Sequence, residues 1–148
     1  VPPIHDITTD TADPPAFQAL AETRRAAPNE VAYPGGDTAA QQERAYPKVQ
    51  PLVVDDAIGR VFEAALAQAR EEGWKIAASD PVAGRIEATA STFWYGFKDD
   101  MVVRLSQTDD GRTRVDVRSA SRVGISDLGA NAARIRNYLA DLQRRLAG

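Results

Sequence analysis

The chain has 148 residues, 43% hydrophobic and 26% charged, an ordinary composition for one globular domain. It has no cysteine and one histidine, His5, which excludes disulfides and thiolate metal sites and argues against a multi-histidine zinc site. No apolar run approaches the roughly 20 residues that a membrane-spanning helix needs. The sequence starts at Val1 rather than at a methionine, so we expect a processed product whose targeting or anchoring segment precedes it.

Residues 1–53 show no clear periodicity and hold most of the prolines, which are typical of turns and extended segments. Apolar residues such as Ile7 and Phe17 recur through this stretch, which a free tail would not need. We therefore predict an N-terminal arm that wraps over the rest of the chain. Short helical turns are expected near Ala16–Arg25 and Thr38–Arg44.

The remaining residues, 54–148, are predicted to form a helix, four strands and a closing helix. Apolar residues at helical spacing predict the first helix over Asp56–Glu72, and a leucine-rich seam predicts the last from about Asp127. Alternation and turn residues between them indicate four strands: Trp74–Ser79, Arg85–Phe97, Met101–Thr108 and Arg112–Ser121. Short connections favour antiparallel neighbours. The expected fold is α+β: residues 1–148 form one domain, with an antiparallel four- to five-stranded meander sheet and two helices on one face.

Charge is distributed unevenly along the chain. Residues 1–100 carry nine basic and sixteen acidic side chains, whereas residues 101–148 carry nine basic and five acidic ones. All the basic residues after position 100 are arginines, which bind carboxylates and phosphates in a bidentate manner. The closing third of the chain therefore holds a concentration of anion-binding groups.

The last strand, the following loop and the closing helix bring many polar groups into one stretch. Alternation places Asp116 and Arg118 on one face of the last strand, and Arg104 is expected opposite them. We predict that these groups meet the polar edge of the closing helix and form an Arg-rich junction. Its candidate ligand-binding residues are Glu87, Arg104, Asp116, Arg118, Ser119, Ser121, Arg122, Asp127, Asn131 and Arg134. The junction is interpreted either as an anion-binding pocket or as an internal network of ion pairs.

Two further features suggest other functions. Glu87 lies mid-strand, where it is interpreted either as a catalytic acid or base or as a member of a salt bridge. Four aromatic side chains in five positions suit a protein-docking surface, unless the N-terminal arm covers them. These candidate partner-binding residues are Phe93, Trp94, Tyr95 and Phe97. No phosphate-binding, dinucleotide or nucleophile motif stands in the chain, so no catalytic residue, metal site or cofactor is predicted. Overall acidity disfavours nucleic acid as a partner.

Short motifs along nearly the whole chain resemble one family. They are Asp6–Asp10 with Asp13-Pro14-Pro15 and Phe17, Tyr46-Pro47, Pro51-Leu52, Gly73-Trp74, Ile86-Glu87-Ala88, Gly96-Phe97 with Asp99-Asp100, and Asp116-Val117-Arg118-Ser119 through Asn131. In these motifs the chain is similar to the bacterial domain-of-unknown-function family 1499, whose members often follow membrane-spanning segments. The resemblance implies one domain in the bacterial cell envelope, located in the periplasm, and implies no catalytic role.

Three functions are compatible with these observations. The first is a non-catalytic periplasmic domain that binds an anionic small molecule or an envelope protein through the Arg-rich junction. The second is a hydrolase- or isomerase-like enzyme that uses Glu87 or an aspartate as base and arginines as electrostatic stabilisers. The third is an assembly module that docks through the exposed aromatic residues.

Overall fold

A computed structural model describes residues 6–26, 31–91, 98–122 and 129–148. Strands and helices alternate irregularly along the chain, as expected for an α+β protein. In chain order they are β1 (Asp6–Thr8), α1 (Ala21–Arg25), α2 (Gly36–Ala45), β2 (Leu52–Val54), α3 (Ile58–Glu71), β3 (Lys75–Asp80), β4 (Arg85–Ser91), β5 (Lys98–Gln107), β6 (Thr113–Ser121) and α4 (Ala130–Ala147). The two long helices and the four long strands confirm the predicted elements, with shifted ends.

The strands form an antiparallel sheet in the order β1-β6-β5-β4-β3, and β2 also pairs with β6. β1 lies along the Arg118–Ala120 end of β6 and β2 along its Thr113–Val115 end. Thr9 bridges the gap between them, because its backbone N–H donates to the carbonyl of Val117. The meander is the predicted one. The two extra strands come from the N-terminal segment, where three residues are too few to show a period.

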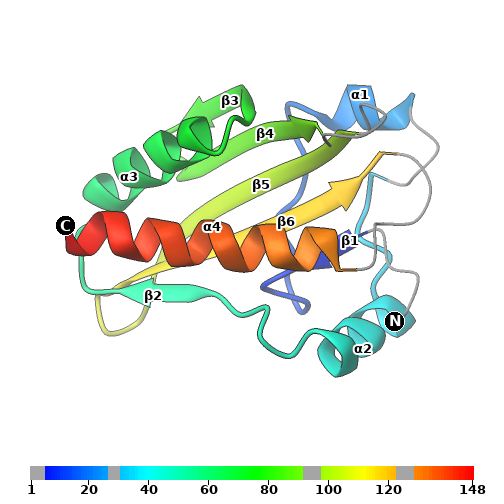
Figure 1. The fold of residues 1–148 in the computed structure, drawn as a ribbon, viewed down its shortest axis with the longest axis horizontal. Helices are drawn as coiled ribbons and strands as arrows, with labels where there is room; N and C mark the ends of the chain where they lie inside the picture. Colours follow the sequence, from blue (N-terminus) through cyan, green and yellow to red (C-terminus); the bar gives the residue numbers. More distant parts are fainter. Residues whose placement is uncertain (1–5, 27–30, 92–97, 123–128) are drawn as a thin grey trace.

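Helices α3 and α4 cover one face of the sheet (Figure 1), which confirms the predicted layering. The apolar stripes of both helices and the apolar residues of the strands form the main core between these layers. Its largest fully buried members include Met101, Val115, Ile135, Tyr138 and Leu142. Tyr138 donates a hydrogen bond to the carbonyl of Ala65 on α3 and its ring stacks on Trp74, with the centroids 4.7 Å apart. These contacts fix the crossing of the two helices.

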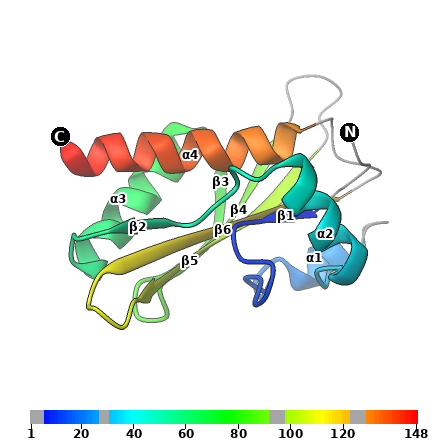
Figure 2. The ribbon, with the colours of Figure 1, turned by 90° about the horizontal axis from the view of Figure 1, so that it is seen from below.

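The N-terminal segment is defined here as residues 6–26 and 31–54, and the part of it around α1 covers the opposite face of the sheet. α1 and the chain leading to it lie below the sheet when α3 and α4 lie above it (Figure 2). A small second apolar cluster forms there, in which Phe17 and Leu20 pack on Val102 and Ala120. Most other contacts of this layer are polar. This side of the sheet holds five of the ten candidate ligand-binding residues: Glu87, Arg104, Asp116, Arg118 and Arg122.

Candidate functional site

Polar side chains from β4, β5 and β6 line the face of the sheet that the N-terminal segment covers. Glu87, Val102 and Arg118 are in register across the three strands, and Arg104 pairs with Asp116. Paired residues of antiparallel strands project to the same side. The predicted common face of Arg104, Asp116 and Arg118 is therefore confirmed.

Arg118 is the centre of this polar layer and is only 1% exposed. Its Nε and Nη2 donate to the two carboxylate oxygens of Asp6 at 2.9 and 2.7 Å, and Asp6 is fully buried. The guanidinium also donates to the carbonyls of Pro15 and Val31 and lies 4.5 Å from the ring centre of Phe17. Every one of these partners belongs to the N-terminal segment, so Arg118 connects that segment to β6.

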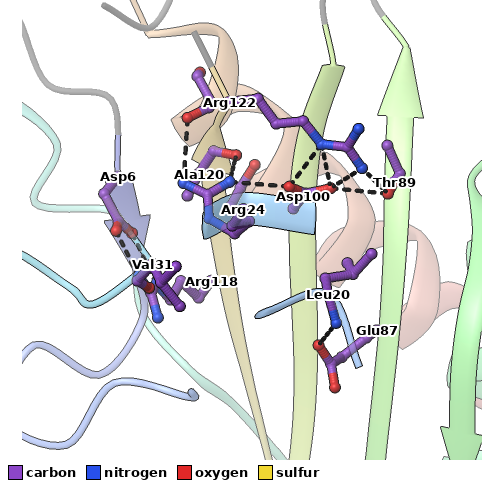
Figure 3. A network of polar contacts seen from close by, with 12 residues as sticks. Asp6, Leu20, Arg24, Val31, Glu87, Thr89, Asp100, Arg118, Ala120 and Arg122 are labelled. Atoms are coloured by element: carbon purple, nitrogen blue, oxygen red, sulfur yellow. Dashed lines mark hydrogen bonds and ion pairs between the residues drawn. The ribbon is translucent and has the colours of Figure 1, made fainter. Parts of the chain in front are cut away.

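Asp100 is a second buried anchor, drawn in Figure 3. It accepts hydrogen bonds from Arg24 of α1 at 3.0 Å and from Arg122 at 2.9 Å. Thr89 of β4 donates a further bond at 2.8 Å. Arg24 also donates to the carbonyls of Ala120 and Ser121, at the end of β6. This carboxylate therefore joins α1, β4 and the end of β6 at one point.

Glu87 holds the turn that precedes α1. Its carboxylate accepts hydrogen bonds from the backbone N–H groups of Gln18, Ala19 and Leu20 at 2.8–3.1 Å. Arg85 lies 3.8 Å from the same carboxylate. A carboxylate occupied by three backbone donors is positioned as a capping group. Of the two interpretations of Glu87, the geometry favours a structural role, with backbone N–H groups as its main partners.

Arg104 and Asp116 complete the layer near the start of the N-terminal segment. Arg104 donates to Asp10 at 3.0 Å and to the carbonyl of Asp13 at 2.9 Å. Asp116 accepts from the hydroxyl of Thr9 at 2.6 Å and from Arg114 at 2.7 Å. The hydrogen bond with Asp116 raises the pKa of Arg114 above its usual value.

We call this set the polar clasp. It consists of Arg24, Glu87, Asp100, Arg104, Asp116, Arg118 and Arg122, with Asp6 and Asp10 as partners. A buried ion pair adds little net stability, since desolvation offsets its attraction, but removing one partner costs about 3–5 kcal/mol. The clasp therefore makes the position of the N-terminal segment specific. Its arginines bind carboxylates of the same chain.

The polar edge of α4 lies on the other side of the sheet. Asn131 accepts a hydrogen bond from Ser119 at 2.7 Å and donates one to Ser121 at 3.1 Å. Arg134 donates to Asp99 at 2.7 Å and to Asn131 at 2.9 Å. Ser119 and Ser121 alternate with Arg118 along β6 and so point toward the helices. Arg134 therefore does not join Arg104, Arg118 and Arg122, contrary to the predicted convergence of the four arginines.

A groove of about 480 Å³ opens beside the N-terminal half of α4. It runs between that helix, the α3–β3 turn and the end of β4. Its lining residues are Glu72, Gly73, Trp74, Ala90, Ser91, Ala130, Ala133, Arg134 and Asn137. Only Nη1 of Arg134 has an acceptor among the described residues, and this side chain is 19% exposed. The groove thus combines an aromatic wall with a guanidinium whose Nε and Nη2 donate to no described residue.

Several predicted residues fall outside the described ranges. Asp127 is among them, as are the candidate partner-binding aromatics Phe93, Trp94, Tyr95 and Phe97. His5, the single imidazole, lies outside them too. The docking hypothesis for the aromatic stretch therefore stays a prediction.

Sequence reasoning missed the acidic and basic partners supplied by distant segments. Asp6 and Arg24 fall in the predicted arm, and Asp99 and Asp100 fall between two predicted strands, yet all four are buried. The one available signal was the alternation of β5, which places Asp100 on the same face as Arg104. The partners from the N-terminal segment carry no such signal, because their position depends on long-range packing.

Two tyrosines have raised pKa values. Burial, with the nearby Asp6 carboxylate, raises the pKa of Tyr33 to about 12, against the opposing effect of Arg118. Complete burial raises the pKa of Tyr138 further. The buried hydroxyl of Tyr33 has no hydrogen-bond partner among the described residues. Neither phenol lines the groove at Arg134.

Neither a metal cluster nor a membrane helix is found in the described part of the chain. Residues 6–26, 31–91, 98–122 and 129–148 contain no group of three or more potential acidic, histidine or cysteine ligands placed to hold a metal ion. None of the helices within those ranges is long and apolar enough to cross a bilayer.

A comparison with known protein families matches residues 6–142 to the family described as protein of unknown function (DUF1499). The chain belongs to this family. The match includes every clasp residue and most of α4, so the DUF1499 region contains both the clasp and the groove. The resemblance inferred from the short sequence motifs is thereby confirmed. A comparison with curated proteins gives no match.

Proposed function

We propose that this DUF1499 protein is a non-catalytic domain of the bacterial cell envelope that binds an anionic ligand in the groove beside α4. The observation that carries the proposal is Arg134, a partly exposed guanidinium that lines a groove of about 480 Å³ and uses one of its terminal nitrogens internally. Location in the periplasm rests on the family resemblance alone.

The size and lining of the groove favour a small organic anion over a free ion. Ligand pockets of about 300–1,000 Å³ usually combine apolar walls with a few polar groups that set orientation. Trp74 supplies an aromatic wall, and Ser91 and Asn137 supply hydrogen-bonding groups. Glu72 lines the groove as well and disfavours a ligand that carries a second anionic group. We therefore expect a carboxylate or phosphate with an apolar body, whose anionic group pairs with Arg134.

The geometry of the clasp favours binding over catalysis. The three other candidate arginines are occupied by carboxylates of the chain, and Glu87 is occupied by backbone donors. An enzyme of the hydrolase or isomerase type needs a base beside its electrostatic stabilisers in a cleft. Neither Glu87 nor an aspartate is among the lining residues of the groove at Arg134, so the bases named for that alternative lie outside the proposed binding site.

Fluorescence titration tests the proposal directly, because Trp74 lines the groove. In a Trp94→Phe background, which leaves Trp74 as the single tryptophan, benzoate, phenyl phosphate and inorganic phosphate are titrated into the protein. Saturable quenching by the organic anions is expected, with affinity at least ~10-fold lower in Arg134→Leu. Arg136→Leu, an exposed position on the same helix, serves as the matched control.

Loss of Arg134 also removes a partner of buried Asp99, so a second variant separates binding from folding. Ala133→Leu fills the groove without removing a charge, and it is expected to abolish quenching while thermal unfolding stays cooperative. Unchanged quenching in both variants, or quenching reduced equally in Arg136→Leu, would overturn the proposal.

A further inference from the structure

A second, separate cleft lies where the chain leaving β1 meets the C-terminal end of α2. Its volume is about 240 Å³, and it shares no lining residue with the groove at Arg134. The lining residues are Thr9, Thr11, Gln42, Glu43, Tyr46, Pro47, Val49 and Gln50. A volume below the usual range of drug-sized pockets suits a ligand of about one ring.

The inner wall of the cleft is fixed by buried hydrogen bonds. The side chain of Gln42 accepts from the N–H of Thr8 at 3.0 Å and donates to its carbonyl at 2.7 Å. Thr9 donates to Asp116 at 2.6 Å and accepts from the N–H of Val117 at 2.9 Å. A wall that is already ordered loses little entropy when a ligand binds.

The outer rim offers hydrogen-bonding groups that this fixed network leaves available. Thr11 donates to one carboxylate oxygen of Glu43 at 3.0 Å, and no described residue donates to the other oxygen. The side-chain amide of Gln50 donates to the carbonyl of Pro47 at 3.1 Å. The side-chain oxygen of Gln50 has no partner among the described residues. The rim therefore presents acceptors to a ligand that carries several donors.

The remaining wall is apolar and aromatic, formed by Tyr46, Pro47 and Val49. Neither arginine nor lysine is among the lining residues, and the one charged side chain is acidic. Such a cleft disfavours anions and suits a molecule with hydroxyl donors on its edge and C–H groups on its face. From this combination we infer that the cleft is a binding site for an uncharged polyol, such as a single sugar ring.

Amide chemical shifts in the intact chain test this site residue by residue. Glucose, N-acetylglucosamine and myo-inositol are titrated into ¹⁵N-labelled protein. Saturable shifts at Thr11, Glu43 and Gln50 are expected for at least one of them. A neutral ligand of about a dozen non-hydrogen atoms implies a Kd on the order of millimolar. Glu43→Ala is expected to weaken this binding at least ~5-fold, whereas the exposed Glu63→Ala serves as the unchanged control.

Two results would overturn the inference, and both differ from a failure to observe anion binding in the groove at Arg134. One is the lack of any saturable shift in these amides with all three polyols while the wild-type spectrum shows a folded protein. The other is a stronger saturable response of the same amides to tetramethylammonium than to the polyols, which would assign Glu43 to a cation site. Neither result bears on anion binding in the groove beside α4.

Discussion

Replacing Arg118 with Leu removes the guanidinium that connects β6 to the N-terminal segment. The change takes the bidentate partner from Asp6, which is fully buried, and the donors from two backbone carbonyls. Breaking a buried ion pair in this way costs about 3–5 kcal/mol, a large part of the 5–15 kcal/mol that stabilises a typical domain. Arg144→Leu, at an exposed helix position paired with Asp141, should change stability by only about 0.5 kcal/mol.

Urea unfolding followed by far-UV circular dichroism measures both changes as free energies. The double variant Asp6→Ala with Arg118→Leu sharpens the test, because it removes both charges of the pair. Its cost should be about 2–4 kcal/mol smaller than the sum of the two single changes. A cost below about 1 kcal/mol for Arg118→Leu, or additive effects in the double variant, would refute the reasoning that this pair is a buried anchor.

Three further outcomes follow from the same structure. Glu87→Ala leaves three backbone N–H groups without their carboxylate and should lower the free energy of unfolding by about 2–4 kcal/mol. Amide hydrogen exchange should also become faster in residues 18–20. Unchanged exchange there would argue against the capping role. Gly84→Ala should lower the free energy of unfolding by about 1 kcal/mol more than Gly111→Ala, as measured by urea unfolding. Both glycines have positive φ, but only at Gly84 would a Cβ meet a backbone oxygen, that of Leu105, at 2.9 Å. Equal losses for the two variants would contradict this reasoning. Since burial raises the phenol pKa of Tyr33 from 10 to about 12, the unfolded state releases its proton first, and stability should fall as pH rises from 10 toward 12. Tyr33→Phe should flatten that fall in a series of denaturation curves, and an unchanged slope would contradict the assignment.

Local patterns were sufficient to predict the body of the fold. The apolar stripe of α3, the leucine seam of α4 and the alternation along β5 and β6 each repeat over many residues, so they indicate both the element and its buried face. The same alternation correctly placed Arg104 opposite Asp116. These features depend on neighbours within one element or one hairpin.

The N-terminal strands and the partners of the arginines depend on contacts between distant segments. β1 and β2 have three residues each, too few for a period, and their pairing with β6 is set by packing. The predicted junction placed Arg118 and Arg134 together because Arg118 precedes and Arg134 follows the same loop. In the folded chain Arg118 points to the N-terminal segment, whereas Arg134 lies on α4 at the opposite face of the sheet. Neither the short strands nor the separation of these two arginines is marked by local periodicity.

The most direct test of anion binding in the groove follows the NMR signals of the arginine side chains in one experiment. It records the side-chain Nε–Hε signals of ¹⁵N-labelled protein during a titration with phenyl phosphate. We expect a saturable shift for Arg134, which lines the groove, and none for the buried Arg24 and Arg118, which are held by Asp100 and Asp6. A saturable shift at Arg118 with no response at Arg134 would show that the clasp is the anion site and would contradict the account.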